Sequence, residues 1–540
     1  MPTKHTAPAD ANLPFVRGIS DPDSGQWVEI TYKDKVALVA YRDFAGDRAS
    51  IWSKLAAQDV VLVSRAAKAS VSEQVDELEK FSDQVVFARP GWHRGQFATA
   101  SGEVFAPRGA LKGIVGFTPV TGKCLESGTL TGWLEQIALP LVGHHIPCFA
   151  IMTCFAAPLL ELVQRSDNFG FELAGSGGKG KSTTQRLMAS VVGPAMSKDQ
   201  GYITTFNMTF AALEQSMKEH SDMPFIIDEA NLFGAGLGGK ADQRAMRDFS
   251  FQMGSGKTKG RYGSHMQQGY RFIYVTSANE PFHELLGNAH RDTANAASDR
   301  LMSITVPDDD AGVFGELPAA IQSYRQFTQA LEKGMGEHFG TAMPKFLRLL
   351  VRAYNEAPDK LIAGIRNRVA KFKAHICANE NNGSDVRVAE AFGLVYAAGC
   401  LARHYKVLPQ EWRSLDAAAQ CYSNFRSTVP VRQSLPERLL AIAERPETMQ
   451  IDRHDLPALT EKQMENAGAF IRTVKGEKLL LMTTSFGKLM FPDWGALSKT
   501  SEFRALNRAD ADGRARGYHC RIRSNAKADW FYAFKLPAEP

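Results

Sequence analysis

The chain has 540 residues, an apolar fraction of 44%, and 63 Lys and Arg against 58 Asp and Glu, which gives a formal net charge of +5. At about 150 residues per domain, this length predicts three or four domains with sizeable cores. The mild positive charge permits a nucleic-acid partner without requiring one. Seven scattered cysteines without a C-x-x-C pair argue against a disulfide framework or a structural zinc site and predict a reducing, cytoplasmic setting.

The chain begins with a polar stretch, residues 1–12, which lacks the pattern of a signal peptide and which we expect to be a disordered tail. Residues 13–122 are dominated by short apolar alternations, such as the period of two at residues 27–32. We expect another strand at residues 60–63 and a helix at residues 71–81. This region is therefore predicted to be an α+β N-terminal domain.

A nearly continuous apolar stretch at residues 146–160 is shorter than a membrane span and contains Pro147 and Pro158. We interpret it as a buried helix beside the core, and we expect no membrane partner.

A phosphate-binding loop is the most informative motif. Residues 175–182 have the pattern G-x-x-x-x-G-K-S, preceded by a short strand-like segment and followed by a helix start. Lys181 is predicted to reach the β- and γ-phosphates and Ser182 to bind Mg²⁺. The predicted cofactors are thus ATP and Mg²⁺, and the nucleotide-binding residues are Gly175, Ser176, Gly177, Gly178, Lys179, Gly180, Lys181, Ser182 and Thr183.

Two carboxylates follow a buried strand downstream of this loop. Residues 223–227 are mostly apolar and end in Asp228 and Glu229. In open α/β sheets, ligands bind at the carboxyl ends of the strands. We therefore predict that Asp228 holds Mg²⁺ and that Glu229 is the general base for the attacking water. The alternative is a strand that ends in a solvated acidic pair.

The next apolar strands end or begin with candidate sensors of the γ-phosphate. Asn279 follows the strand at residues 272–276 and is predicted to position water, although an Asn at such a place often caps a turn. Arg300 precedes the following strand and is a candidate arginine finger for a neighbouring subunit. Arg291 is a competing candidate, and a surface pair of Asp299 with Arg300 is the alternative.

Together these features resemble the AAA+ ATPases over about residues 169–404. More closely, the chain is similar to the family known as domain of unknown function 927, whose members resemble superfamily III and minichromosome-maintenance hexameric helicases. The resemblance is carried by residues 171–175, 225–229, 254–257 and 386–392. It implies a helical lid, a ring of subunits, and a role for Arg387 as a second sensor of the γ-phosphate. A surface arginine on a helix is the alternative for Arg387.

Glycines alternate with cations between the acidic strand and the Asn279 strand, at residues 254–265. Lys257, Lys259 and Arg261 are predicted to contact the phosphates of single-stranded DNA, and Tyr262 to stack on a base. The resemblance implies that this segment lines the pore of a ring. A solvated loop is the alternative.

A second basic cluster lies in the C-terminal region, residues 430–540, which mixes helix and strand and is compatible with a winged-helix-like or β-capped module. The cluster is a candidate face for duplex DNA, although charge runs of this kind more often form a solvated surface. Its members are Arg504, Arg508, Arg514, Arg516, Arg521, Arg523 and Lys527.

The sequence therefore predicts an α/β protein with an AAA+ P-loop ATPase core at residues 123–310 and a helical lid at residues 311–429, flanked by the N- and C-terminal modules. The predicted function is that of an ATP-dependent DNA helicase or translocase, acting as a homo-oligomeric ring, a hexamer by resemblance, in replication of a mobile element, phage or plasmid. One alternative is a DNA-binding switch or assembly platform, for example in phage defence. Another is a protein remodeller, against which the cationic loop argues.

Overall fold

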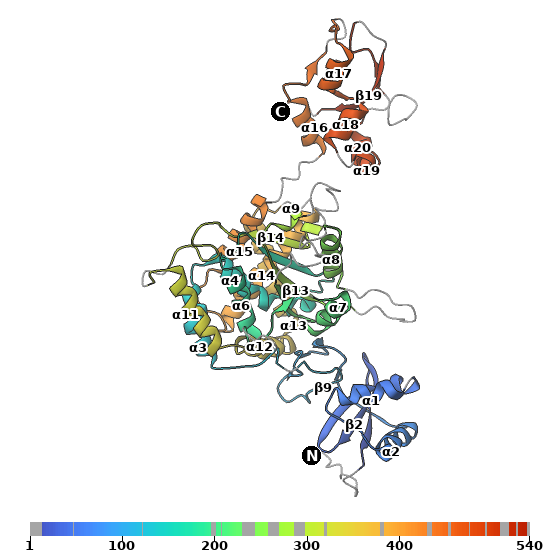
Figure 1. The fold of residues 1–540 in the computed structure, drawn as a ribbon, viewed down its shortest axis with the longest axis vertical. Helices are drawn as coiled ribbons and strands as arrows, with labels where there is room; N and C mark the ends of the chain where they lie inside the picture. Colours follow the sequence, from blue (N-terminus) through green and yellow to red (C-terminus); the bar gives the residue numbers. More distant parts are fainter. Residues whose placement is uncertain are drawn as a thin grey trace. The chain divides into compact units, whose positions relative to one another are not determined.

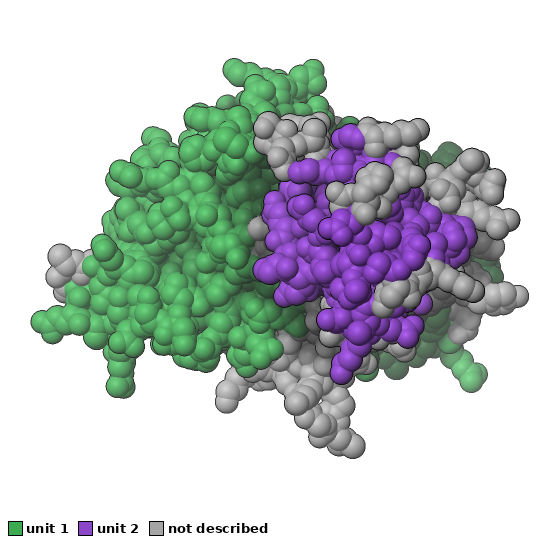
Figure 2. All heavy atoms as spheres, turned by 90° about the horizontal axis from the view of Figure 1, so that it is seen from above, with its two compact units in different colours: residues 1–286, 296–428 green, residues 287–295, 429–540 purple. Residues whose placement is uncertain are grey.

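The computed structural model describes the chain from residue 13 to 536 except residues 47, 121, 196–200, 207, 229–242, 257–268, 286–296, 318–320, 379–382, 429–434, 452–454, 475, 492–493, 508–517 and 525–527 (Figure 1). The chain divides into two compact units, drawn in Figure 2. Unit 1 comprises Met1–Leu286 and Ala296–Thr428, and unit 2 comprises Gly287–Asn295 and Val429–Pro540.

The N-terminal part of unit 1 is a four-stranded sheet in the order β3-β2-β1-β4, with two helices packed on an apolar cluster. The prediction of a strand at residues 60–63 is wrong, because this segment pairs with no strand among the described residues and exposes Val61 and Val63. The expected helix begins and ends earlier than predicted. The elements are β1 (Phe15–Asp21), β2 (Gly25–Tyr32), β3 (Lys35–Ala40), α1 (Arg48–Ala56), α2 (Arg65–Asp76) and β4 (Phe81–Asp83).

Short strands connect this sheet to the core. Two of them pair in parallel, and three form a small antiparallel sheet. The elements are β5 (Val86–Phe87), β6 (Gly91–His93), β7 (Gln96–Ala98), β8 (Val104–Phe105) and β9 (Ile114–Val115).

The core of unit 1 is a five-stranded parallel sheet in the order β11-β12-β13-β10-β14. Its central strands are buried on both faces, as near-continuous apolar strands of a parallel sheet are expected to be. The strands are β10 (Phe169–Ala174), β11 (Thr204–Thr205), β12 (Met223–Asp228), β13 (Phe272–Ala278) and β14 (Leu301–Thr305).

Helices cover this sheet on both faces (Figure 1). Phe171 of β10 contacts Phe149 of α4 on one face, while Tyr274 of β13 contacts Phe249 of α8 on the other. The stretch expected to form one buried helix, residues 146–160, is buried as predicted but forms most of α4 and the start of α5, which are separate helices. The helices are α3 (Leu130–Trp133), α4 (His145–Ala156), α5 (Leu159–Leu162), α6 (Lys181–Val192), α7 (Phe210–Glu219), α8 (Gln243–Ser255) and α9 (Phe282–Leu285).

The segment after the sheet is helical, as expected, and its helix α14 packs on α4. Phe392 of α14 stacks on Phe149 at a ring distance of 5.2 Å and contacts Phe171 at 5.0 Å. None of the described helices combines the length and apolarity that a membrane crossing requires. The helices are α11 (Tyr324–Glu337), α12 (Ala342–Glu356), α13 (Pro358–His375), α14 (Gly383–His404) and α15 (Ser414–Thr428).

Unit 2 is built on a mixed sheet in the order β15-β16-β17-β19-β18. Alternate residues of β17 belong to two different apolar clusters, so both faces of the sheet are covered. The elements are α16 (Leu435–Ala443), β15 (Met449–Gln450), α17 (Glu461–Ala467), β16 (Ala469–Val474), β17 (Glu477–Met482), α18 (Thr484–Met490), α19 (Trp494–Leu497), α20 (Ser501–Leu506), β18 (Tyr518–Cys520) and β19 (Asp529–Lys535).

Candidate nucleotide site

The predicted phosphate-binding loop joins β10 to α6. Gly178 and Gly180 have φ values of 76° and 89°, a region that side chains other than glycine rarely adopt. A Cβ at Gly180 would also overlap the side chain of Val313. The helix α6 begins directly at Lys181, so its free N–H groups and positive dipole end face the loop. The local backbone therefore has the form that a phosphate group requires.

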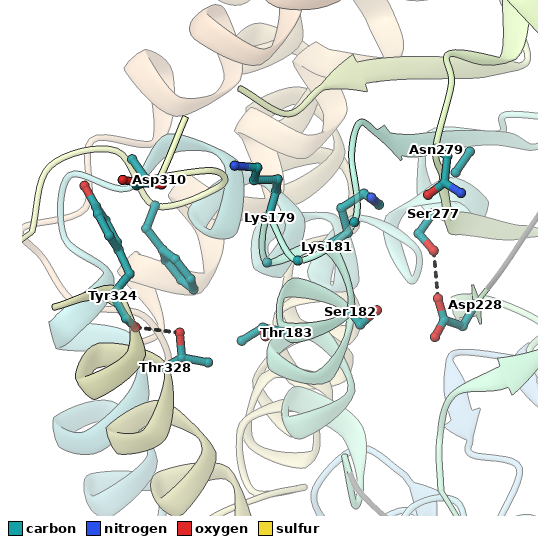
Figure 3. A pocket seen from close by; sticks show the side chains of 16 residues that line it. Lys179, Lys181, Ser182, Thr183, Asp228, Ser277, Asn279, Asp310, Tyr324 and Thr328 are labelled. Carbon is teal, nitrogen blue, oxygen red and sulfur yellow. Dashed lines mark hydrogen bonds between the residues drawn. The ribbon is translucent and has the colours of Figure 1, made fainter. Parts of the chain in front are cut away.

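A cavity of about 600 Å³ opens over this loop, a volume within the usual range of small-molecule sites (Figure 3). The loop lies between two further walls: Asp228, Ser277 and Asn279 on one side, and Asp310, Tyr324 and Thr328 on the other. The lining residues are Gly177, Gly178, Lys179, Gly180, Lys181, Ser182, Thr183, Asp228, Ser277, Ala278, Asn279, Asp310, Ala311, Phe314, Tyr324 and Thr328.

Lys181 is buried at the base of the cavity. Its ammonium group donates to the carbonyl oxygen of Ser176 at 2.7 Å and to that of Gly175. Burial lowers the pKa of Lys181, and the negative charge of Asp228 acts in the opposite direction. The lysine thus contacts carbonyl groups of its own loop at the point where a phosphate would offer stronger, charged acceptors.

Asp228 ends β12 at the carboxyl edge of the sheet, and its Oδ1 accepts a hydrogen bond from the Ser277 hydroxyl at 2.7 Å. Sequence reasoning missed Ser277. The strand register pairs Ile227 with Thr276, which brings the next residue of each strand side by side. The contact between Ser277 and Asp228 could not be predicted from the sequence, because the register of two strands depends on the fold. Glu229, the predicted general base, lies outside the described residues.

Asn279 follows β13 and is exposed in the cavity. The N–H of Gly175 donates to the carbonyl oxygen of Ala278 at 3.1 Å, which ties the end of β13 to the first residue of the phosphate loop. The structure thus brings Asn279 to the same cavity as Lys181 and Asp228.

The opposite wall of the cavity comes from a segment without a sequence motif. Lys179 donates to the carbonyl oxygen of Asp309 at 3.0 Å, and the N–H of Val313 donates to the carbonyl oxygen of Lys179 at 3.1 Å. Tyr324 of α11 donates its hydroxyl to the carbonyl oxygen of Gly315 at 2.8 Å. These contacts hold residues 308–315 along the phosphate loop, and no pattern in the sequence indicated them.

The two predicted arginines lie away from this cavity. Arg300 immediately precedes β14, at the amino edge of the sheet, and its guanidinium lies over the ring of Phe251 at 5.1 Å. Arg387 lies 4.0 Å from the carboxylate of Asp299. Neither lines the cavity, so Arg387 is not placed to contact a γ-phosphate held by its own chain in this structure.

The predicted DNA-contacting residues Lys257, Lys259, Arg261 and Tyr262 lie outside the described residues, as does Arg291. Only part of the C-terminal basic cluster is described: Arg504, Arg521 and Arg523 in unit 2. Arg521 donates to the carbonyl oxygen of Arg523 at 3.3 Å.

Comparison with known proteins supports the resemblance stated from the sequence. Residues 16–268 match the family described as "Domain of unknown function (DUF927)". Among solved structures, one described as "SCCmec type IV Cch - active helicase" is similar with a TM-score of 0.63 and 14% identity, covering 97% of this chain and 93% of that one.

A second structure, the apo C-terminal region of NrS-1, has a TM-score of 0.28 and 9% identity, covering 72% of this chain and 88% of that one, which is too low to support an argument. No curated protein matches the sequence. At 14% identity the first similarity concerns the fold alone. Residues 16–268 of this chain are thus similar to the domain of unknown function 927 family, and the fold of the chain is similar to that of the structure described as "SCCmec type IV Cch - active helicase".

Proposed function

We propose that this protein is an ATP-dependent DNA helicase or translocase that works as a ring-shaped homo-oligomer. The observation that carries the proposal is the convergence of Lys181, Asp228 and Asn279 on one cavity over the phosphate-binding loop. A lysine, a carboxylate and an amide around such a loop are the groups that phosphoryl transfer requires. By the family resemblance the ring is a hexamer, with a role in replication of a mobile element, phage or plasmid.

The residues around the cavity fit a nucleotide with its magnesium ion. Ser182 offers a hydroxyl and Asp228 a carboxylate in the same cavity, and oxygen donors of this kind are the ligands that Mg²⁺ prefers. When bound, the ion neutralises charge on the β- and γ-phosphates. Lys181 would exchange its hydrogen bonds to the carbonyl oxygens of Gly175 and Ser176 for hydrogen bonds to the phosphates. Glu229 would take the proton of the attacking water, and Asn279 would orient that water.

The separation between Arg300 and the cavity supports the proposed ring. Arg300 precedes β14, whereas the phosphate loop follows the carboxyl end of the neighbouring strand β10. Five residues of strand span about 16 Å, so Arg300 is out of reach of the nucleotide in its own subunit. We infer that it completes the site of the adjacent subunit, where a guanidinium stabilises the charge that develops on the transferred phosphoryl group.

DNA is the proposed substrate because of the cationic segment that contains Lys257, Lys259 and Arg261, whose alternating glycines and charges suit a phosphate backbone. Single-stranded DNA in the pore is the form that this segment would grip, with Tyr262 stacking on a base.

Two assays test the proposal. ATP hydrolysis should rise on addition of single-stranded DNA, and a forked duplex should be separated in the presence of ATP. Lys181→Ala should abolish both, whereas Lys257→Ala/Lys259→Ala/Arg261→Ala should abolish the stimulation and the strand separation but keep the hydrolysis measured without DNA. Stimulation without strand separation would favour the DNA-binding switch. A wild-type protein that DNA does not stimulate, matched by the triple variant, would rule out the DNA motor.

A further inference from the structure

Asn168 is a fully buried residue that immediately precedes β10, at the opposite end of that strand from the phosphate loop. Its Nδ2 donates to the carbonyl oxygens of Met253 and Tyr270, both at 3.0 Å. Its Oδ1 accepts from the backbone N–H of Phe272 at 3.1 Å. Its own N–H donates to the carbonyl oxygen of Gly254, also at 3.0 Å. Both ends of the side-chain amide are therefore bonded to main chain on other elements.

The partners of Asn168 lie on the two sides of residues 257–268, the predicted DNA-contacting segment. Gly256 and Tyr270 flank that segment, and the N–H of Tyr270 donates to the carbonyl oxygen of Gly256 at 2.6 Å. An Asn that caps a turn bonds to main chain a few residues away. The side-chain partners of Asn168 are 85, 102 and 104 residues away along the chain. Asn168 therefore connects elements that are distant in the sequence and does not cap a local turn. We call its contacts with Met253, Gly254, Tyr270 and Phe272 the Asn168 junction.

The same junction is continuous with the nucleotide site. The strand β10 is hydrogen-bonded to β13 on one side and β14 on the other, and Gly175 of the phosphate loop follows its last residue. A six-residue strand held on both sides is a stiff connection of about 20 Å. A displacement of the phosphate loop along this strand would reach Asn168, and through it both flanks of the segment.

We propose that Asn168 is a positioning residue that couples the nucleotide site to DNA engagement by fixing both flanks of residues 257–268 to the strand that carries the phosphate loop. This inference rests on the proposed function. It requires that loss of the amide uncouple the two sites while each still works alone, because Asn168 does not line the nucleotide cavity.

The test compares ATP hydrolysis by full-length protein with and without a single-stranded oligodeoxythymidylate. Asn168→Ala removes all three side-chain bonds. We expect ATP affinity and hydrolysis without DNA to stay near wild type, while the stimulation by DNA falls by at least about fivefold, the lower end of usual coupling between sites. The ratio of the two rates is the readout, because a general loss of folded protein lowers both rates equally.

Gln96→Ala is the matched control. Gln96 is also a buried amide with two main-chain partners, the carbonyl oxygen of Leu111 at 3.1 Å and the N–H of Gly113 at 2.9 Å. It lies on β7, and these two hydrogen-bond partners are not part of the Asn168 junction. This variant should keep the wild-type stimulation ratio.

Gly256→Ala is a second variant of the same junction. Gly256 has a φ of 59°, and a Cβ there would overlap the carbonyl oxygen of Tyr270 and the side-chain amide of Asn168. We expect the same loss of stimulation although Asn168 itself is kept, so this variant tests the inference if Asn168→Ala does not fold. If the folded variants are stimulated by DNA to the same extent as wild type, this inference is overturned but the proposed function is not. A wild-type protein without stimulation would overturn the proposed function and the inference together.

Discussion

Glu172 is a carboxyl group enclosed in the middle of the core sheet, and Glu172→Gln tests what its ionisation does to stability. Its Oε2 accepts from the Ser303 hydroxyl at 2.6 Å and from the backbone N–H of Phe282 at 2.7 Å. Among the described residues, its Oε1 has no hydrogen-bond partner, and neither has the hydroxyl of Thr276, which pairs with Glu172 in the strand register. Desolvation by burial raises the pKa of Glu172 to about 7 from an ordinary value of 4.5.

The sign of the effect follows from the raised pKa. Between about pH 4.5 and 7 the folded protein keeps the Glu172 proton while the unfolded chain has lost it. The contribution of the Glu172 proton to the free energy of unfolding is therefore complete below about pH 4.5 and is lost as the pH rises to about 7. The difference between these pKa values corresponds to about 3 kcal/mol of unfolding free energy.

A glutamine resembles the protonated acid at every pH. Its carbonyl oxygen can accept from Ser303 and Phe282, and its NH₂ group can donate towards Thr276. Relative to wild type, we expect Glu172→Gln to gain up to about 3 kcal/mol between about pH 5 and pH 8. Urea unfolding of both proteins at the two pH values measures this gain.

Glu356→Gln serves as the control, because Glu356 is an exposed carboxylate paired with Arg352 and should show almost no such pH-dependent gain. A difference between Glu172→Gln and wild type that is the same at both pH values would refute the reasoning.

Three further predictions concern the nucleotide site. Ser277→Ala removes the hydroxyl that donates to Asp228, so we expect the Mg²⁺ concentration for half-maximal hydrolysis to rise about 10- to 100-fold, and an unchanged Mg²⁺ titration would contradict this. Tyr324→Ala should raise KM for ATP with little change in kcat, because Tyr324 lines the cavity wall opposite Asp228, while Tyr324→Phe keeps the ring, loses only the bond to Gly315 and should raise KM less. Arg300→Ala should bind ATP but lose about 10³-fold in kcat. Mixing it with Lys181→Ala should restore turnover, because one interface then combines an intact lysine with an intact arginine, and mixtures without any regain would speak against a shared site.

The sequence predicted the parts of the nucleotide site that depend on strand ends. The phosphate loop is a contiguous motif, and Asp228 and Asn279 each follow an apolar strand. Since parallel strands end at one edge of a sheet, their polar ends meet without any knowledge of the strand order. Hence the structure brings Lys181, Asp228 and Asn279 to one cavity, as the pattern predicted.

The rest of the cavity depends on tertiary contacts that no local pattern encodes. Tyr324 and Thr328 come from a helix more than 140 residues beyond the phosphate loop. Asp310 comes from an irregular segment that is held by hydrogen bonds to the side chain and the backbone of Lys179. The N-terminal strand expected at residues 60–63 fails for a related reason: an apolar run can extend without pairing.

The two ends of β10 lie at opposite edges of the core sheet and carry different groups of candidate functional residues. Its carboxyl edge carries the phosphate loop with Asp228 and Asn279, and its amino edge carries Arg300 and the Asn168 junction. The N–H of Gly170 donates to the carbonyl oxygen of Arg300, so the arginine is tied to the same strand as the junction. We therefore expect a change at a bound phosphate that shifts β10 to act both on the proposed intersubunit arginine and on the flanks of the proposed DNA-contacting segment. If so, Asn168→Ala should impair stimulation by DNA without the loss of kcat expected for Arg300→Ala. Asn168→Ala removes the side-chain bonds to the flanks of residues 257–268, whereas Arg300→Ala removes the proposed intersubunit guanidinium.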